Sequence, residues 1–554
     1  MPIDKRDWAT IAILSLVFFL MATWNLGMNS VPLSAWQSSR GESFYIDLGS
    51  PENVSAVYFL LKRGNADLKV YTGYPGNWNG EIPAPIQDYY SWKKVRINRE
   101  TQFVRFAFGV SYGEIAEIAV LNGEGKRIVV NAIRAETGED KELMRLIDEQ
   151  DKVECPPTYM SGTYFDEIYY VRAAEDYINL EEPYEWTHPP LGKLIIAAGI
   201  LAFGYNPFGW RIMGVIFATL MIPVMYLLGK KMFGTWIGAF VPAFLLMFDF
   251  MHFTMGRIAT IDTFVVLFSL TSQFFFFAYF QDVLNRGWKA STRPLFLAIL
   301  FFSLGFSTKW YVLYGFVGQV FLLLAIRLRD LLAIKQGWTA KVKAFFSRPF
   351  LLVLLFLVAA AAIYVSTFIP YMIIGHTFKD VYEAQFSMYN YHSTLTATHP
   401  FSSQWWTWPL ISRPVWLYVS DLPGGVVSTI AAMGNPAVWW FGFAFILLAL
   451  GKTIREKNHI CLFIVTIFFF QWLPYVLISR TLFLYHFYFN VPLLALATAY
   501  FLNESWNRKW GKMTGMAYLI GVVILFGLFY PVISGNLAPY WWREQLKWFR
   551  SWVF

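Results

Sequence analysis

The sequence predicts a polytopic α-helical membrane protein that carries an inserted β-sandwich or jelly-roll domain in its first external loop. Of its 554 residues, 56% are hydrophobic and only 15% are charged, a composition far from that of a soluble domain of this size. Apolar segments long enough to cross a bilayer recur along the chain. Residues 31–133, by contrast, have a soluble composition and separate the first apolar segment from the others.

The amino-terminal segment, Trp8 to Leu26, is apolar and long enough to span a membrane as a helix. It follows Lys5 and Arg6 and lacks the small-residue cleavage site of a removable signal peptide. Residues 1–30 are therefore expected to form an uncleaved signal anchor whose amino end is cytoplasmic.

The insert at residues 31–133 alternates apolar and polar side chains in short runs such as "SFYIDLG", "SAVYFLLK" and "QFVRFAFG". Gly, Pro and Asn separate these runs, which predicts a compact antiparallel sandwich of short strands. Its closing run "GEIAEIAVLNGEGKRI" resembles the last strands of a galactose-binding-like jelly roll. Carbohydrate binding and a purely structural role both stay open for this domain.

Hydrophobic segments resume after residue 205, and residues 206–534 are expected to hold the remaining membrane spans. These spans are predicted near residues 208–228, 235–254, 260–281, 294–308, 311–327, 350–371, 437–451, 459–478, 482–502 and 514–533. With the signal anchor they make about eleven spans.

Basic residues test this topology, because short cytoplasmic loops carry an excess of Lys and Arg. Clusters such as Lys230 with Lys231 and Arg508 with Lys509 all fall in alternate loops if residues 194–204 do not cross. That stretch is also shorter than the roughly twenty residues that a spanning helix needs. The segment "PPLGKLIIAAGILAFG" is therefore predicted to be an interfacial helix.

This topology places the amino terminus in the cytoplasm and the carboxyl terminus outside the cell. Residues 134–205 then form a linker and a juxtamembrane loop, 372–436 an external loop and 535–554 an external amphipathic tail. The net charge of +8 does not indicate nucleic-acid binding, because the basic residues cluster in short loops between apolar runs. Cys155 and Cys461 lie far apart without a CxxC or Cys/His spacing, so neither a disulfide framework nor a thiolate metal site is predicted.

Several motifs occur in order between Tyr164 and Leu502: "FDEIYYVR", "HPPLGK", "WRIMGVIFATLMIPVMY", "HPFSSQWWTWPLISRPVW", "MGNPAVWW" and "SRTLFLYHFYFNVP". Together they resemble the protein O-mannosyltransferase family in a prokaryotic form. The resemblance implies a class C glycosyltransferase fold in the plasma membrane. It also implies inverting transfer of mannose from a polyprenyl (dolichyl) phosphate to Ser or Thr hydroxyls of exported proteins. Eukaryotic members of the family carry a trefoil lumenal module that is absent here, and the sandwich before Tyr164 is not part of the usual family pattern; these two departures indicate a prokaryotic member.

The resemblance places the general base at Asp166, in the first external loop. Sugar transfer from a phosphate to a hydroxyl needs a carboxylate to take the acceptor proton and cations to hold the departing phosphate. Glu167, about 100° round a helix from Asp166, is assigned to the same catalytic site, where it orients the acceptor or a basic partner. Arg211, at the border of a span, matches an Arg of the family and is expected to pair with a carboxylate of the preceding loop.

Further side chains are candidate ligands of the substrate or its phosphate, with anchoring at the membrane interface as the alternative role. For the phosphate these are Arg257, Lys309, Arg413, Arg480 and His486, of which the last two lie within a matching motif. For the sugar and its surroundings they are His399, Gln404, Trp405, His188 and Lys193. No obligatory metal or other cofactor is expected, although a divalent cation at the phosphate stays open.

Two other functions fit parts of the pattern. One is a glycosyltransferase with the same donor class that uses another sugar or acts on a lipid or surface polymer. The other is a membrane transporter of lipid-linked or small solutes. The sequence shows no inverted half repeat, and its polar residues gather on one face instead of at a midplane site, which argues against a transporter.

Overall fold

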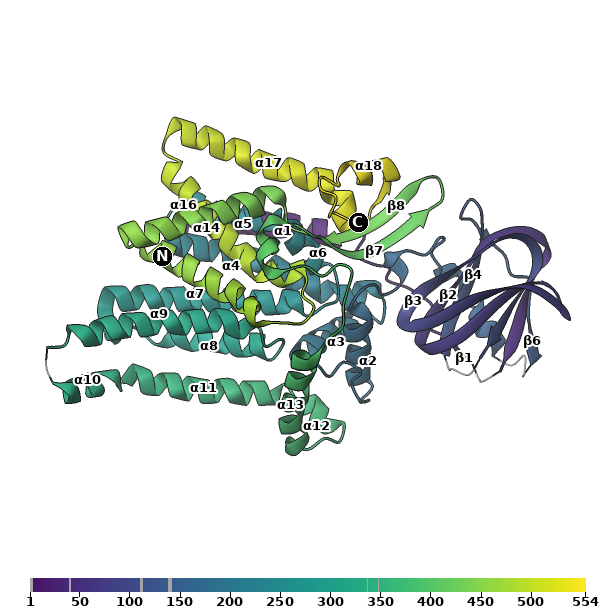
Figure 1. Cartoon of the computed structure of the whole chain (residues 1–554), viewed down its shortest axis with the longest axis horizontal. Coiled ribbons are helices and arrows are strands. Elements are labelled where there is room, and N and C mark those ends of the chain that lie inside the picture. The colour runs from purple at the N-terminus through teal and green to yellow at the C-terminus, as the bar shows by residue number, and fades with distance from the viewer. Residues whose placement is uncertain (1–2, 39–40, 110–112, 138–141, 336, 347) are drawn as a thin grey trace.

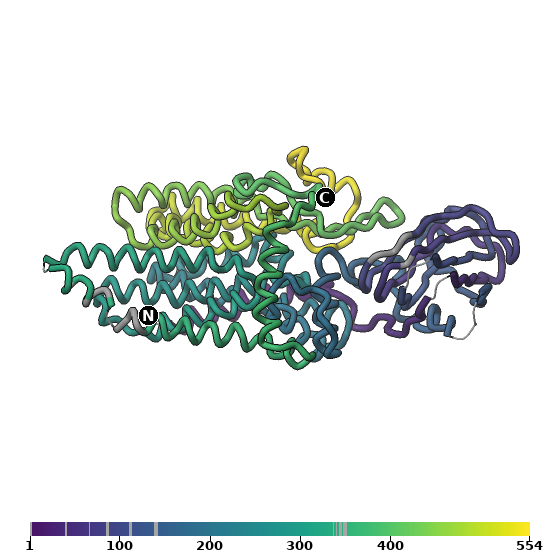
Figure 2. The backbone as a smooth tube through the Cα atoms, turned by 60° about the horizontal axis from the view of Figure 1, so that its bottom comes forward, coloured from purple at the N-terminus to yellow at the C-terminus, as the bar shows by residue number. Residues whose placement is uncertain are grey.

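The computed structural model describes residues 3–38, 41–109, 113–137, 142–335, 337–346 and 348–554. A bundle of roughly parallel helices carries a β-sheet domain beyond one of its ends (Figure 1). We call this end of the bundle the sheet end and the opposite end the far end. The amino terminus lies toward the far end and the carboxyl terminus near the sheet end in both views (Figures 1 and 2).

Seven helices of the described residues are long and apolar enough to cross a membrane. They are α1 (Lys5–Thr23), α4 (Pro207–Phe233), α7 (Asp262–Arg286), α9 (Val312–Ala333), α14 (Pro436–Glu456), α15 (His459–Trp472, extended by η6 at Leu473–Leu477) and α17 (Lys509–Ser534). The pair α5 (Trp236–Met247) and α6 (Phe250–Gly256) meets at 59° and makes an eighth candidate. The multi-pass architecture is thereby confirmed.

Three further predicted spans fall short of the same length criterion over their described residues. They are α8 (Arg293–Phe306), α11 (Arg348–Ser366), of which only Leu352–Ser366 enters the comparison, and α16 (Val491–Ser505), which follows η7 (Leu484–Asn490). Short connecting helices are η4 (Gly287–Lys289) and α10 (Trp338–Phe345). The total of about eleven spans stays a prediction.

The apolar stretch after the Pro-Pro turn forms the separate helix α3 (Leu191–Phe203), of 13 residues. At 1.5 Å per residue it is about 20 Å long, short of the roughly 30 Å of a bilayer core. Gly204, with a φ of +91°, ends α3, and the Asn206 side chain then caps α4 by accepting from the Gly209 N–H at 2.7 Å. Figure 1 shows α3 beside α2 (Glu167–Ile178) at the sheet end.

The sheet domain contains six antiparallel strands: β1 (Trp36–Gln37), β2 (Ser43–Tyr74), β3 (Asn77–Phe108), β4 (Gly113–Asn122), β5 (Arg127–Ile128) and β6 (Ala132–Thr137). The order is β1-β4-β2-β3, with β5 beside β4 and β6 beside β2. The prediction of many short strands was wrong in detail, because the runs "SFYIDLG" and "SAVYFLLK" belong to the single 32-residue strand β2. Glycines with positive φ, such as Gly49 and Gly64, bend this strand without ending it.

Strand β2 curls back on its long partner. Val70 pairs with both Ile82 and Phe106, so one strand joins two parts of β3. The curved sheet encloses its own apolar core, which includes Phe44, Phe59, Val104, Phe106, Ile118 and Val120. The predicted charged linker follows as the 3-10 turns η1 (Leu143–Leu146), η2 (Gln150–Lys152) and η3 (Tyr159–Ser161).

The predicted external loop 372–436 is ordered at the sheet end. It holds α12 (Ile369–Ile373), α13 (Phe378–Thr394), η5 (Trp405–Leu410), β7 (Val415–Leu422) and β8 (Val426–Ala432). Strand β8 also pairs with β9 (Leu537–Pro539), which precedes α18 (Tyr540–Gln545). The carboxyl-terminal tail is therefore docked: Trp552 is buried, and its Nε1 donates to the Ile411 carbonyl at 2.7 Å.

Candidate active site

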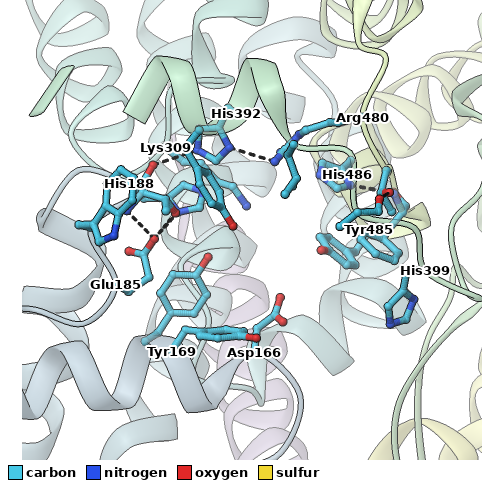
Figure 3. A pocket seen from close by; sticks show the side chains of 18 of the residues that line it. Asp166, Tyr169, Glu185, His188, Lys309, His392, His399, Arg480, Tyr485 and His486 are labelled. Atoms are coloured by element: carbon cyan, nitrogen blue, oxygen red, sulfur yellow. Dashed lines mark hydrogen bonds and ion pairs between the residues drawn. The ribbon is translucent and has the colours of Figure 1, made fainter. Parts of the chain in front are cut away.

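A polar cavity of about 490 Å³ opens at the sheet end of the bundle. It lies between α2, the loop after α2, α13 and the segment before α16 (Figure 3). Its ionisable lining residues are Asp166, Glu185, His188, Lys309, His392, His399, Arg480 and His486, together with Tyr169, Tyr170, Tyr184, Tyr391 and Tyr485. Carboxyl, imidazole and cationic side chains from distant parts of the chain thus share one space.

Asp166 precedes the first residue of α2 and points its carboxyl group into the cavity (Figure 3). Phe165, directly before it, has a φ of +51°, a left-handed conformation that is uncommon for a non-glycine residue. The pKa of Asp166 is raised to about 7, mainly by burial; Lys309 lowers the pKa, whereas the nearby carboxylates of Asp262 and Glu185 raise it. A carboxyl group with this pKa can take up a proton near neutral pH.

Glu167 and Arg211 form a fully buried ion pair outside the cavity. Nε and Nη2 of Arg211 donate to the two carboxylate oxygens at 2.7 and 2.8 Å, and its other N–H groups donate to three backbone carbonyls. The backbone N–H groups of Tyr164 and Ala259 also donate to the Glu167 carboxylate. The predicted pairing of Arg211 is confirmed. Arg211 is the basic partner named in one of the two expected roles of Glu167, and both side chains use their hydrogen-bonding groups within the protein, outside the cavity.

The turn before α3 is held together by Glu185 and Lys193. The buried ammonium group of Lys193 donates to the Glu185 carboxylate at 2.8 Å and to the backbone carbonyls of Glu185 and His188, each at 2.7 Å. The other Glu185 oxygen lies 2.9 Å from Nδ1 of His188. Burial alone would raise the pKa of Glu185, but Lys193 and His188 outweigh it and hold the pKa below its usual range. Lys193 therefore shapes the turn, and only His188 and Glu185 of this group reach the cavity.

His392, on α13, connects this turn to Arg480. Its Nε2 lies 2.9 Å from the Thr187 carbonyl oxygen, and its Nδ1 lies 2.9 Å from Nη1 of Arg480. Because the guanidinium can only donate, Nδ1 is the acceptor and Nε2 carries the proton. Burial lowers the pKa of His392 to about 3, with His188 and Arg480 adding to the effect, so the ring is neutral. Arg480 is thereby held at the cavity with donors left for an anion.

Lys309 and His486 line the same part of the cavity (Figure 3). Nζ of Lys309 lies 2.9 Å from Oδ1 of Asp262, which also accepts from the Tyr311 hydroxyl at 2.8 Å. The His486 ring stacks on Tyr485 with centroids 4.8 Å apart. These contacts fix a cationic edge made of Lys309 and Arg480, with the ring of His486 beside it.

A second hollow of about 340 Å³ adjoins the cavity and shares this cationic edge with it. Its other walls are mainly aromatic and aliphatic: Trp310, Tyr311, Leu313, Tyr314, Tyr475, Ile478 and Leu482. They come from the start of α9 and from the segment after α15. An anion held at the cationic edge can therefore extend an apolar chain into this hollow.

Four other predicted residues line neither the cavity nor the hollow: Arg257, Gln404, Trp405 and Arg413. Arg257 is buried and donates to four backbone carbonyls near the carboxyl ends of α1 and α17, so its charge serves two helix ends and not a phosphate. The Trp405 ring packs edge to face on Trp472, and the Trp405 backbone carbonyl accepts a hydrogen bond from Nε1 of Trp472 at 3.0 Å. His399, by contrast, lines the cavity as predicted (Figure 3).

Sequence reasoning missed Glu185 and the positioning role of His392. The signal for Glu185 was present, since an acid stands three residues before His188 and eight before Lys193. No sequence signal pairs His392 with Thr187 and Arg480, because the contacts span 205 and 88 residues along the chain.

Comparison with known proteins agrees with this architecture. Residues 203–379 match the family model described as dolichyl-phosphate-mannose-protein mannosyltransferase, and residues 377–552 match the C-terminal four TMM region of protein-O-mannosyltransferase. A polyprenol-phosphate-mannose–protein mannosyltransferase of Corynebacterium glutamicum is 26% identical over 429 residues, which cover 66% of this chain and 81% of the relative. A protein of the same name from Mycobacterium tuberculosis is 24% identical over 436 residues, which cover 66% of this chain and 80% of that relative.

Among solved structures, the chain resembles the Saccharomyces cerevisiae protein O-mannosyltransferase Pmt1-Pmt2 complex bound to the sugar donor. The TM-score is 0.60 at 13% identity, over 71% of this chain and 89% of the other. This likeness shows that the two proteins share a fold. The family models and the named relatives define a membrane-embedded glycosyltransferase. The chain belongs to the protein O-mannosyltransferase family, whose two models together span residues 203–552. Asp166 and the sheet domain lie before this matched region.

Proposed function

We propose that this protein transfers mannose, with inversion at the anomeric carbon, from a polyprenyl (dolichyl) phosphate to Ser or Thr hydroxyls of exported proteins. The observation that carries the proposal is the carboxyl group of Asp166 facing Lys309 and Arg480 across one cavity (Figure 3). Family membership supports the donor class and a protein acceptor.

In the proposed reaction the Asp166 carboxylate takes the proton of the acceptor hydroxyl as its oxygen attacks the anomeric carbon. The bond from that carbon to the phosphate oxygen breaks, and its electron pair leaves with the polyprenyl phosphate. Lys309 and Arg480 stabilise the charge that grows on this phosphate, because they are fixed before the reaction begins. His399 and His486 remain candidate contacts of the sugar and the phosphate.

The polyprenyl chain is proposed to occupy the adjoining hollow. Tyr314, Tyr475 and Leu313 give that hollow walls suited to an isoprenoid, and the shared cationic edge places the phosphate at the boundary of the two spaces. This arrangement separates the lipid side of the site from the Asp166 side, where the acceptor enters.

The protein is proposed to lie in the plasma membrane with its amino terminus cytoplasmic and its active site and carboxyl terminus external. The basic start of α17, which begins at Lys509, lies at the far end of the bundle, as does the carboxyl end of α9 (Figure 1). The positive-inside rule assigns such ends to the cytoplasm. Acceptors then meet the site only after export.

No obligatory resident metal or other cofactor is proposed, because Lys309 and Arg480 already supply fixed positive charge at the phosphate position. A divalent cation bound to the phosphate itself stays open. Transfer that persists after chelation with EDTA supports the proposal, and stoichiometric binding of Mg²⁺ or Mn²⁺ by the donor-free protein, together with loss of transfer on chelation, contradicts it.

The deciding experiment incubates the purified protein with labelled polyprenyl-phosphate mannose and a Ser/Thr peptide. We expect label on the peptide from the wild type, none from Asp166→Asn, and normal transfer from Asp151→Asn, which changes an exposed carboxylate. Label only on a lipid or polymer, or from another sugar, favours the other glycosyltransferase functions. Uptake of the donor into vesicles without covalent transfer favours a transporter.

A further inference from the structure

A groove of about 870 Å³ lies between the sheet domain and α2, apart from the cavity described above. Arg63, Asn65 and Asp88 belong to its wall on the sheet domain, and Arg172 belongs to its wall on α2. We call it the interdomain groove. It joins the cavity, because Tyr169 and Tyr184 line both spaces. A chain lying in the groove therefore arrives at the cavity within one helical turn of Asp166.

The wall shared by the two spaces is flat and aromatic. The rings of Tyr169 and Tyr184 are parallel within 3°, with centroids 6.4 Å apart. The guanidinium of Arg172 lies 3.8 Å from the centroid of the Tyr184 ring. Its Nε is buried and has no hydrogen-bond partner among the described residues. Because this Nε is closed off from solvent, a chain in the groove meets the terminal Nη groups of the guanidinium instead.

The sheet domain is fastened to α2, so the groove has a defined width. The Tyr89 hydroxyl hydrogen-bonds to Glu175 on α2 and lies 2.5 Å from the Tyr205 hydroxyl. Arg63 is ion-paired with Asp176 on α2 and with Glu181 in the loop that follows it. These contacts join β2 and β3 directly to the helix that begins beside Asp166.

The chemistry of the groove suits a polypeptide better than a lipid. Its carboxylates are Asp88, Glu114, Glu181 and Glu182, and its arginines are Arg63 and Arg172. An isoprenoid needs apolar walls such as those of the hollow beyond Lys309, whereas a polypeptide backbone offers carbonyl oxygens to Arg172. The excess of carboxylates disfavours an acidic chain.

We propose that the interdomain groove binds an extended segment of the acceptor polypeptide next to its Ser or Thr, with the Nη groups of Arg172 donating to a backbone carbonyl. The acidic rim selects against acidic residues in that segment. This inference rests on the proposed transfer to a protein. The sheet domain is then one wall of the acceptor site. Helix α2 begins directly after the base, Asp166, and carries Arg172, which binds the acceptor.

The first test compares a long Ser/Thr peptide with a blocked single threonine, which is too short to reach the groove. For Arg172→Ala we expect the KM for the long peptide to rise on the order of tenfold, the loss typical of one charge-assisted hydrogen bond. The KM for the donor and the transfer to blocked threonine stay unchanged. Arg329→Ala, which removes an exposed arginine on α9, is the matched control and leaves every constant unchanged.

Peptide charge gives a second readout. Wild type should prefer Lys over Glu beside the acceptor residue, and Glu114→Gln, in the rim of the groove, should reduce this preference. If wild type transfers mannose but Arg172→Ala keeps the KM for the long peptide and the charge preference is absent, the groove is not the acceptor site and the proposed function stands. If wild type transfers to no hydroxyl acceptor, the proposed function fails.

A binding measurement keeps the inference testable if Arg172→Ala does not fold or transfer is absent. A photo-crosslinking residue placed at the exposed Asn65 should crosslink to the acceptor peptide, and one at the exposed Asn79, outside the groove, should not. Excess unlabelled peptide should abolish the Asn65 crosslink. Equal crosslinking at both positions, or none at Asn65, overturns the assignment.

Discussion

Arg211 grips both carboxylate oxygens of Glu167, at 2.7 and 2.8 Å, and neither side chain is exposed to solvent. The neighbouring carboxyl group, on Asp166, points into the cavity, which Glu167 does not line. Two adjacent acids therefore have separate tasks: Glu167 fixes α2 to α4, and Asp166 is left free for chemistry. The following predictions depend on this division.

Breaking the buried ion pair of Glu167 and Arg211 should lower the stability of the protein without removing a group that takes part in transfer. We expect Glu167→Gln and Arg211→Met each to lower the free energy of unfolding by about 3–5 kcal/mol, because each substitution leaves a buried charged group without its partner. Thermal unfolding in detergent measures this loss, and Asp166→Asn is the control that should unfold at or above the wild-type temperature. A Glu167→Gln protein of normal stability that cannot transfer would assign Glu167 to catalysis instead.

The pH dependence of transfer should report Asp166. Since its pKa is raised to about 7, kcat/KM should fall about tenfold per pH unit below 7 and level off above it. A raised pKa also means that ionisation destabilises the folded state as the pH increases, so Asp166→Asn should gain stability relative to wild type at pH 8. Rates measured from pH 5 to 9 test this; a profile without the acid limb excludes Asp166 as the base.

Arg480 should control affinity for the donor. We expect Arg480→Ala to raise the KM for the polyprenyl-phosphate sugar about 10- to 100-fold, because a charge-assisted contact to phosphate is lost. Arg480→Lys should restore little of the affinity for the donor, since Lys lacks the planar guanidinium group that can donate to His392 and to the phosphate at the same time.

His392 should act on the donor only through Arg480. His392→Ala is expected to raise the donor KM less than Arg480→Ala does, and the double variant should be no worse than Arg480→Ala alone. Donor titrations of the three variants measure this coupling. Additive losses would mean that His392 contacts the donor independently.

The Glu185–Lys193 contact should stabilise the turn before α3, and its two charges should not be needed for transfer. Glu185→Gln leaves the buried Lys193 without a counter-ion, so we expect a lower unfolding temperature and slower transfer. The double variant with Lys193→Met should recover most of the stability. If it recovers none, the paired charges themselves are required.

Much of the fold followed from local patterns. Apolar length identified the long helices, and the short length of residues 194–204 together with the alternation of basic loops predicted α3 as a separate helix. The curled sheet was less predictable, because bends at Gly49 and Gly64 resemble strand ends in a sequence although the hydrogen bonding continues through them.

The sequence by itself determined the membrane class, the family resemblance and the importance of the stretch around Asp166, since these depend on composition and on motifs within single segments. Only the tertiary structure decided which polar residues share the cavity. In the structure, Glu167, Arg211 and Arg257 make buried contacts, and His392 hydrogen-bonds to Arg480. The physical reason is that a buried charge must find partners, and in this chain those partners stand far away in sequence and meet only when the helices pack.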